Sequence, residues 1–221
     1  MAKSANNPHW ALLGGTFDPI HIGHLRIAIQ LREMGFDKVL LIPNRIPPHR
    51  PQPQANGEHR LAMLKLSCED LSGVVACDIE LEREELSYSA ITVKALRETY
   101  PDIQFTWVMG EDAWQGFEHW YKPLELLDQA NILVISRPGH MNSSHWQEQQ
   151  LELRQSNLSQ LLDENHGRIC LHHLPELDIS ASYLRRALNQ GENVTFLTPD
   201  KVLAYINEHQ LYQRKHADRA N

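Results

Sequence analysis

Two histidines, His21 and His24, follow the first predicted strand of the chain, just after a Gly-Gly turn. Such a turn lets the backbone approach a ligand closely, and the N-terminus of the next helix offers unpaired N–H groups. Residues three apart on a first helical turn project to the same side. Imidazoles placed there can donate hydrogen bonds to phosphate oxygens that gain charge in a transition state. The spacing therefore predicts a phosphate site at this turn.

Other chemistries for the same turn have less support. The chain contains neither the GxGxxG pattern of dinucleotide-binding turns nor the GxxxxGK[ST] pattern of Walker-type loops. Asp18, His21 and His24 share a spacing of three that would suit a transition metal, but no glutamate of the HExxH type lies nearby. A metal site, as in a metallohydrolase, and a purely structural turn stay open as alternatives.

Strand and helix patterns alternate along the chain around this turn. Apolar runs of strand length occur at Trp10–Leu13, Val39–Ile42, Phe105–Met109, Asn131–Ile135 and Ile169–Leu174, and an extended segment at Val74–Leu81. Helices are predicted over 23–34, 58–71, 121–127, 146–162 and 180–190, over 89–100 with Ser89 as cap, and from Pro199 after the cap Thr198.

Strands that are apolar throughout and alternate with helices indicate a parallel sheet covered on both faces. We therefore expect an α/β fold with a single doubly wound, mainly parallel sheet over residues 8–212, followed by a polar C-terminal tail, 213–221. Ligands of such sheets bind beyond the carboxyl ends of the strands, which is where the histidine turn lies.

The composition excludes several partners. The 221 residues include 21 Lys and Arg against 28 Asp and Glu, a net charge of −7, which disfavours a general nucleic-acid binder. The three cysteines, Cys68, Cys77 and Cys170, are widely spaced and odd in number, as expected in a reducing cytosol. No apolar run has the length of a secretory signal or a membrane span. We expect a cytoplasmic protein without nucleic-acid or membrane partners.

Two motifs resemble the signatures of one enzyme superfamily. Gly14–Pro19 leading into His21–His24 resembles the opening motif of the nucleotidyltransferases that carry HxGH. Ile179–Arg185 is similar to their second signature, ISxTxxR, with Ser182 in place of threonine, which keeps the hydroxyl. Two signatures in the right order, far apart in the chain, are more specific than either alone.

Further segments narrow the resemblance and extend it over nearly the whole chain. Together they are similar to the bacterial nicotinate-nucleotide adenylyltransferases: Ile42–Arg50, Ser87–Ser89, Gly110–Asp112, Phe117–Tyr121 and Arg137–Gly139. The resemblance implies a Rossmann-like fold, Mg²⁺ as cofactor, and two substrates, ATP and nicotinate mononucleotide. It also implies direct in-line attack of the mononucleotide phosphate on the α-phosphorus of ATP, which forms deamido-NAD and pyrophosphate.

The resemblance also assigns roles to residues. His21 and His24 would be catalytic. The residues expected to bind ATP and its phosphates are Gly14, Gly15, Thr16, Phe17, Asp18, Arg137, Ser180, Ser182 and Arg185. The residues expected to bind the acceptor are Asn44, His49, Arg50, Ser89, Asp112, Trp120 and Tyr121. Mg²⁺ would be held mainly by substrate phosphates, with Asp112 serving either a ribose hydroxyl or the ion through water.

Each assignment has a structural alternative. Ser180 has the pattern of an ordinary helix cap, and Arg185 that of a solvated helix face. The proline-rich segment carrying His49 and Arg50 is either a rigid surface loop or a lid. Trp120 and Tyr121 are either core residues or a wall on which a pyridine ring stacks. For Trp114 and Trp146 we expect core packing.

Other functions on the same fold stay open too. An adenylyltransferase of another acceptor, such as nicotinamide mononucleotide, would share both signatures. A non-catalytic nucleotide-binding module would share the fold, because fold does not determine function.

Overall fold

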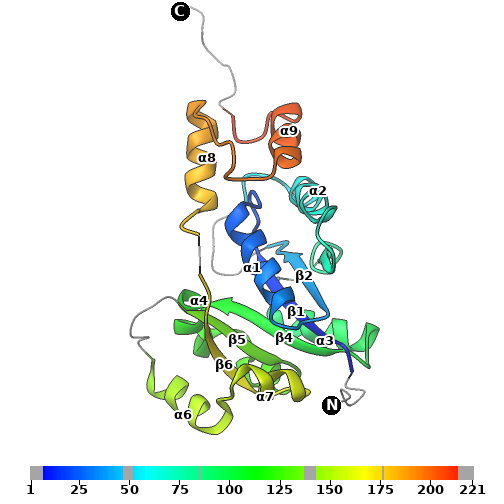
Figure 1. Cartoon of the computed structure of the whole chain (residues 1–221), viewed down its shortest axis with the longest axis vertical. Coiled ribbons are helices and arrows are strands. Elements are labelled where there is room, and N and C mark those ends of the chain that lie inside the picture. The colour runs from blue at the N-terminus through cyan, green and yellow to red at the C-terminus, as the bar shows by residue number, and fades with distance from the viewer. Residues whose placement is uncertain (1–6, 47–51, 85, 137–142, 176, 214–221) are drawn as a thin grey trace, which may run out of the picture.

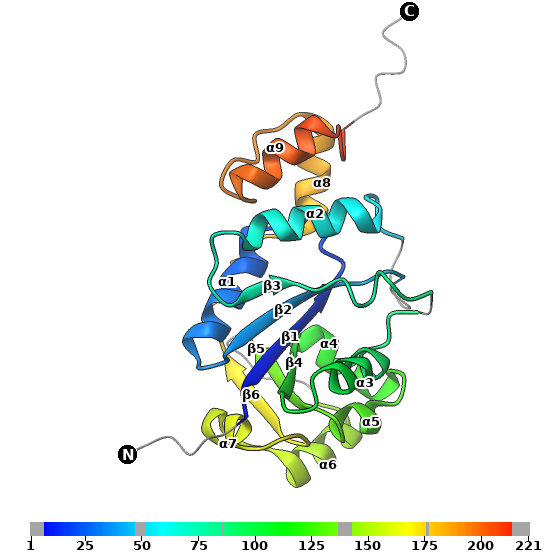
Figure 2. The ribbon, with the colours of Figure 1, turned by 90° about the vertical axis from the view of Figure 1, so that its right-hand side faces the viewer.

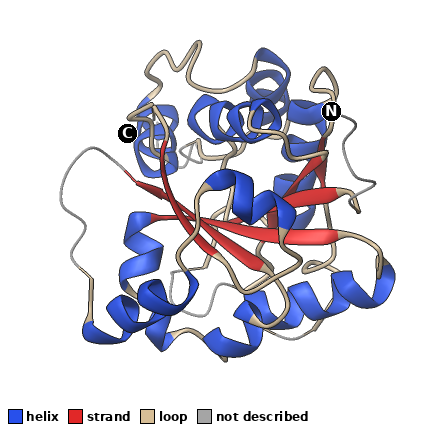
Figure 3. Ribbon diagram, turned by 60° about the horizontal axis from the view of Figure 1, so that its bottom comes forward, coloured by secondary structure: helices blue, strands red, loops and turns tan. Residues whose placement is uncertain are grey.

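In the described part of the chain, six parallel strands form one sheet in the order β3-β2-β1-β4-β5-β6 (Figures 1 and 3). The computed structural model describes residues 7–46, 52–84, 86–136, 143–175 and 177–213. The strands are β1 (His9–Gly15), β2 (Lys38–Pro43), β3 (Val74–Ala76), β4 (Gln104–Gly110), β5 (Asn131–Ser136) and β6 (Ile169–His173). The doubly wound parallel sheet expected from the apolar runs is confirmed.

Helices lie on both faces of this sheet (Figure 2), and one hydrophobic cluster packs against each face. Alternate side chains of β1 enter different clusters, Ala11 and Leu13 one and Leu12 the other. The first cluster includes residues of α1 (Ile22–Glu33), α2 (Gly57–Cys68), α7 (Leu158–Asp163), α8 (Ala181–Gln190) and α9 (Asp200–Glu208). The second includes residues of α3 (Ser89–Thr99), α4 (Glu111–Gln115), η1 (Phe117–His119), α5 (Pro123–Leu127) and α6 (His145–Arg154). None of the described helices has the length and apolarity that crossing a bilayer requires.

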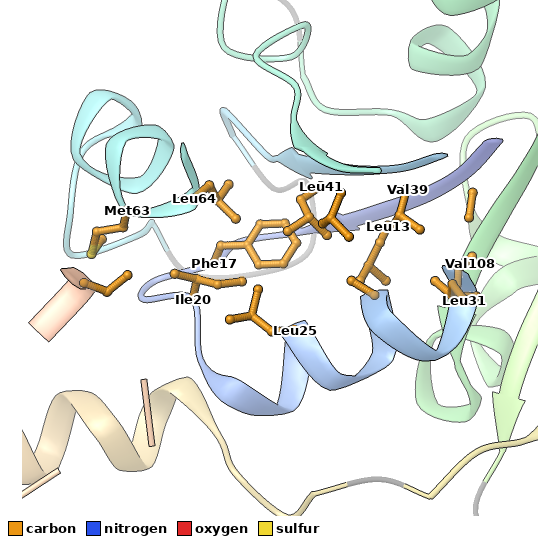
Figure 4. Packing of buried hydrophobic residues seen from close by; sticks show 14 of the residues in the cluster. Leu13, Phe17, Ile20, Leu25, Leu31, Val39, Leu41, Met63, Leu64 and Val108 are labelled. Carbon is orange, nitrogen blue, oxygen red and sulfur yellow. The ribbon is translucent and has the colours of Figure 1, made fainter. Parts of the chain in front are cut away.

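The connection between β1 and α1 is anchored in the first cluster. Figure 4 shows Phe17 and Ile20 between Leu25 of α1 and Leu64 of α2. Both anchoring side chains are almost fully buried. Truncating a buried phenylalanine to alanine lowers the free energy of unfolding by about 3–5 kcal/mol. The packing of Phe17 and Ile20 therefore fixes the position of this connection.

Three predicted elements differ from the structure, and one observed helix has no predicted counterpart. Only Val74–Ala76 of the extended segment 74–81 is a strand. The predicted helix 146–162 is two helices, α6 and α7, because Asn157 begins a new capping box. The predicted helix 121–127 begins later, at Pro123, where proline suits the first turn. The short helix α4, directly after β4, was not predicted.

Two predicted helix caps are also wrong. Helix α3 begins at Ser89, so Tyr88 is the cap residue and no side chain caps the helix. Thr198 does not cap α9, because its buried hydroxyl donates to the Ile20 carbonyl at 2.9 Å. The predicted polar tail lies, apart from Gln213, outside the described residues.

The strand order places a ligand crevice between β1 and β4. The connections from these neighbouring strands lead to opposite faces of the sheet, which leaves a gap beyond their carboxyl ends. β1 ends at Gly15 and β4 at Gly110. Helices α8 and α9 stand beyond this carboxyl edge, on the side of α2 (Figures 1 and 2). The histidine turn therefore faces the crevice.

At the amino end of β1, a buried histidine makes the free energy of unfolding depend on pH. His9 lies 2.7 Å from the Thr106 hydroxyl, and burial lowers its pKa from 6.5 to about 4, although the Leu162 carbonyl and Asp37 oppose the shift. Between these values the unfolded state binds the proton and the folded state does not. We therefore expect the free energy of unfolding to fall by up to roughly 3 kcal/mol as the pH drops through this window.

Urea unfolding at about pH 7 and about pH 4.5 measures this loss. The variant His9→Gln has a polar side chain that does not titrate, so its free energy of unfolding should fall less over the same interval. An equal fall in both proteins would assign the acid sensitivity to other groups.

Candidate active site

Two cavities meet at the carboxyl ends of β1 and β4. The first has a volume of about 480 Å³ and the second about 640 Å³. We name the first the aromatic cavity, because its walls include Tyr88, Trp107, Trp120 and Tyr121. We name the second the histidine cavity, because its walls include His21, His24, Ser180, Ser182 and Arg185. The cavities share four lining residues, Gly14, Gly15, Thr16 and Asp112.

The Gly-Gly turn lies where the cavities join, and side chains would not fit there. A Cβ on Gly14 would lie 2.8 Å from Cζ2 of Trp107, a buried ring of β4. A Cβ on Gly15 would lie 3.0 Å from Cζ of Phe17, whose own backbone has a φ of +49°. The glycines therefore leave bare backbone between the two cavities, as a polyphosphate site requires.

The two histidines stack on each other at the N-terminus of α1. Their ring centroids lie 3.7 Å apart with planes 25° from parallel, and the Phe17 ring meets His24 edge-on at 5.0 Å. His21 is the cap residue of α1 and Gly23 lies between the histidines on the first turn. A Cβ on Gly23 would lie 3.0 Å from Nδ1 of His21. The predicted common direction of the two imidazoles is confirmed, and Gly23 makes room for it.

Both imidazoles are neutral near pH 7. Burial lowers the pKa of His21 from 6.5 to about 4. Burial, and then the charge of His21, lower the pKa of His24 well below 6.5, even though part of that side chain reaches the surface. Nδ1 of each ring is buried and finds no hydrogen-bond partner among the described residues. Rings with unused hydrogen-bonding capacity at a helix N-terminus are suited to an anionic ligand.

Asp18 is buried beneath the same turn, and its carboxylate binds the chain itself. It accepts hydrogen bonds from the backbone N–H groups of Gln54 at 2.8 Å and Ala55 at 3.1 Å, and from the Tyr212 hydroxyl at 2.7 Å. These bonds fill much of its accepting capacity. Although Asp18 lines the histidine cavity, the bonds do not support the alternative of a metal ligand.

The second signature lies across the histidine cavity from the turn. Ser180 caps α8, its hydroxyl accepting from the Tyr183 N–H at 3.2 Å, so the structural reading of this residue is confirmed alongside its place in the cavity wall. Arg185 donates to the Asp18 carbonyl at 2.7 Å and to the Ser182 hydroxyl at 3.2 Å. Its Nε is buried and unpartnered within the described part of the chain. Arg185 is thus fixed in the cavity, not on a solvated face.

Aromatic rings and a helix N-terminus form the aromatic cavity. Tyr88 and Tyr121 stack at 4.5 Å with planes 26° apart, and Tyr121 is substantially exposed. Ser89, at the first position of α3, lines the same cavity. Trp120 joins the cavity wall to the core, since its ring meets Phe117 edge-on at 5.4 Å. The expected core packing of Trp114 and Trp146 is confirmed.

Asn44 belongs to a buried polar network that the sequence did not reveal. Its side chain donates to the buried carboxylate of Glu80 at 3.4 Å, and Thr92 of α3 donates to the same group at 2.6 Å. Burial raises the pKa of Glu80. The Ser87 hydroxyl accepts a hydrogen bond from the Arg45 N–H at 2.9 Å. Ser87 also lines the aromatic cavity. Hydrophobic patterning carries no signal for a buried glutamate, because it identifies only apolar faces.

Three predicted site residues, His49, Arg50 and Arg137, lie outside the described residues. The described residues also contain no group of three or more His, Cys, Asp or Glu side chains that could hold a metal ion. Their three cysteines are free.

Comparison with known proteins identifies close relatives in sequence. A family model described as cytidylyltransferase-like matches residues 12–187. A protein of Shewanella putrefaciens named "Probable nicotinate-nucleotide adenylyltransferase" is 38% identical over 209 residues, covering 91% of this chain and 97% of that protein. A protein of the same name from Escherichia coli is 38% identical over 208 residues, covering 92% of this chain and 98% of that protein.

Solved structures share the fold. Nicotinic acid mononucleotide adenylyltransferase of Plasmodium falciparum, complexed with NaAD, superimposes with a TM-score of 0.70 at 18% sequence identity, covering 92% of this chain and 97% of that one. The same enzyme complexed with APC gives a TM-score of 0.69 at 18% identity, covering 93% and 97%. Both superpositions include nearly all of this chain.

Proposed function

Because the chain belongs to the nicotinate-nucleotide adenylyltransferase family, we propose that it transfers the adenylyl group of ATP to nicotinate mononucleotide, forming deamido-NAD and pyrophosphate. The observation that carries the proposal is the meeting of the two cavities at Gly14, Gly15 and Thr16. Two nucleotides bound one in each cavity would bring their phosphates together over bare backbone.

In this reaction an oxygen of the mononucleotide phosphate forms the new bond to the α-phosphorus, and the bond from that phosphorus to the bridging oxygen of pyrophosphate breaks. The substrate supplies the nucleophile, so the protein needs to align two polyanions and stabilise charge. His21 and His24, neutral donors beside the turn, would bind the oxygens that gain charge. Arg185 and the N-terminus of α8 would receive the departing pyrophosphate.

The aromatic cavity suits a pyridine ring that bears a carboxylate. The ring would pack against Trp120 and Tyr121, which line the cavity. The N-terminus of α3, at Ser89, lacks a side-chain cap, so its first N–H groups and the positive end of its dipole are available to an anion.

Mg²⁺ would enter this site with ATP. The ion keeps several waters and binds phosphate oxygens with one or two carboxylates, so a protein cluster of three ligands is not required. Asp112 lines both cavities and would hold the ion through water or bind a ribose hydroxyl. Bound Mg²⁺ would neutralise charge on the triphosphate.

Pyrophosphate release from ATP with each candidate acceptor tests the proposal. We expect kcat/KM to be higher for nicotinate mononucleotide than for nicotinamide mononucleotide by about 10²-fold or more, because the carboxylate carries a negative charge that the helix N-terminus stabilises and the neutral amide does not. A preference for the amide would indicate the adenylyltransferase of the other acceptor. Binding of ATP without pyrophosphate release with either acceptor would indicate the non-catalytic module.

We also propose that the reaction takes place in the cytosol. The free cysteines support this location, because thiols stay reduced there.

A further inference from the structure

The end of the described chain returns to the phosphate-binding turn. Tyr212 donates its hydroxyl hydrogen to Oδ1 of Asp18 at 2.7 Å, across 194 positions of sequence. The tyrosine is buried and has a φ of +62°, and Gln210 has one of +50°. Non-glycine residues adopt this backbone region at a cost in free energy. We take the contact between Tyr212 and Asp18 to offset part of that cost at residues 210–212. Figures 1 and 2 show this last segment beside α8 and α2, beyond the edge of the sheet.

Asp18 connects Tyr212 to two walls of the histidine cavity. The same carboxylate accepts from the N–H groups of Gln54 and Ala55, and Gln54 lines the cavity. Oδ2 of Asp18 also lies 3.9 Å from the Arg185 guanidinium, which donates to the Asp18 carbonyl at 2.7 Å. The position of this carboxylate therefore sets the positions of the Arg185 guanidinium and the 52–55 segment together.

A second buried cation depends on the same group. Arg60 is almost fully buried and donates to the carbonyls of Thr16 and Ala55. Burial lowers its pKa, whereas the charge of Asp18 opposes that shift. Asp18 thus interacts with the charges of two guanidinium groups, and Tyr212 is its one side-chain hydroxyl donor within the described residues. Removing that hydroxyl leaves Oδ1 of the buried carboxylate with one fewer donor, so its position is set by the N–H groups of Gln54 and Ala55 and by the two guanidinium charges alone.

We propose that Tyr212 is a positioning residue for the ATP side of the reaction, acting through Asp18 on Arg185 and the 52–55 segment. This inference rests on the proposed function, in which the histidine cavity binds the triphosphate. The aromatic cavity does not include Asp18, Gln54 or Arg185, so a change at Tyr212 should affect binding of the mononucleotide much less than binding of ATP. A purely structural role would change stability but would not separate the two substrates.

The test is the variant Tyr212→Phe, which keeps the ring and removes one oxygen. We expect KM for ATP to rise about 10-fold, as loss of a hydrogen bond to a buried charged group implies, and KM for nicotinate mononucleotide to stay within about 2-fold. Calorimetric titration with α,β-methylene-ATP should show the same loss of affinity without any turnover.

Tyr205→Phe is the matched control. Tyr205 lies on α9, and its hydroxyl lies 2.9 Å from Nδ1 of His59 on α2, whereas the described hydrogen bonds to the Asp18 carboxylate do not include it. The control should leave both KM values and the affinity for the analogue unchanged. Equal KM changes for both substrates in Tyr212→Phe, the same changes in Tyr205→Phe, or no change at all would overturn the inference.

The titration keeps this inference separate from the proposed function. If the wild-type protein released no pyrophosphate with any acceptor, the proposed function would fail. Weaker binding of α,β-methylene-ATP to Tyr212→Phe, but not to Tyr205→Phe, would still support the positioning role of Tyr212.

Discussion

Replacing His21 by alanine is expected to lower kcat for pyrophosphate release by about 10²–10³-fold, which is the effect of removing one donor to a developing anionic charge. The imidazole is neutral and buried beside the Gly-Gly turn, and the described residues offer Nδ1 no partner. Its hydrogen-bonding capacity is thus not used by the described part of the chain. Because the contact strengthens mainly in the transition state, KM for either substrate should change much less than kcat.

His21→Asn provides the comparison, because its amide offers an N–H donor in a shorter side chain. It should recover part of the lost turnover, whereas alanine should not. Urea unfolding of both variants near pH 7 controls for damage to the fold, since Nδ1 of the imidazole has no hydrogen-bond partner among the described residues. Turnover by His21→Ala at the wild-type rate would remove this residue from the mechanism and support a binding module.

Local patterns were sufficient to predict the sheet. The segments around Ala11, Leu40 and Leu133 are apolar on both sides because each strand is covered by helices on both faces, so the pattern reports the architecture directly. The break at Asn157 could not be seen in the same way. A polar helix and a polar connection have similar hydrophobic patterns. The capping box at Asn157 shows that a second helix begins there.

Local patterns likewise predicted one part of the candidate site and not the other. His21 and His24 could be paired from the sequence because residues three apart at the start of a helix lie on the same side, and the two rings stack even though His21 is the cap residue with an extended backbone. The partners of Asp18 and Glu80 could not, because Tyr212 and Thr92 reach them through tertiary folding. Asp18 shows the consequence, since the resemblance assigned it to phosphate binding whereas its carboxylate is occupied by the chain. Its direct contact with phosphate stays a prediction.

Gly23→Ala should lower kcat by about 10–10²-fold without removing any catalytic atom, since a displacement of about 1 Å in an active site can have an effect of this size. The added Cβ would lie 3.0 Å from Nδ1 and 3.1 Å from Cε1 of His21, and 3.4 Å from the Leu177 carbonyl oxygen. The imidazole is the side that must move, because it is attached by rotatable bonds. Any movement separates it from His24, on which it stacks.

Stability distinguishes this displacement from general damage. Alanine favours the helix over glycine by about 1 kcal/mol, which offsets the crowding, so the free energy of unfolding should stay close to the wild-type value. Gly57→Ala is the matched control, since Gly57 begins α2 and its Cβ would crowd the flexible end of Leu81 at 3.0 Å, with Nη2 of Arg60 at an ordinary contact distance of 3.8 Å. The control should retain kcat within about 2-fold. Equal losses of kcat in both variants would mean that the position of the His21 ring does not limit the reaction.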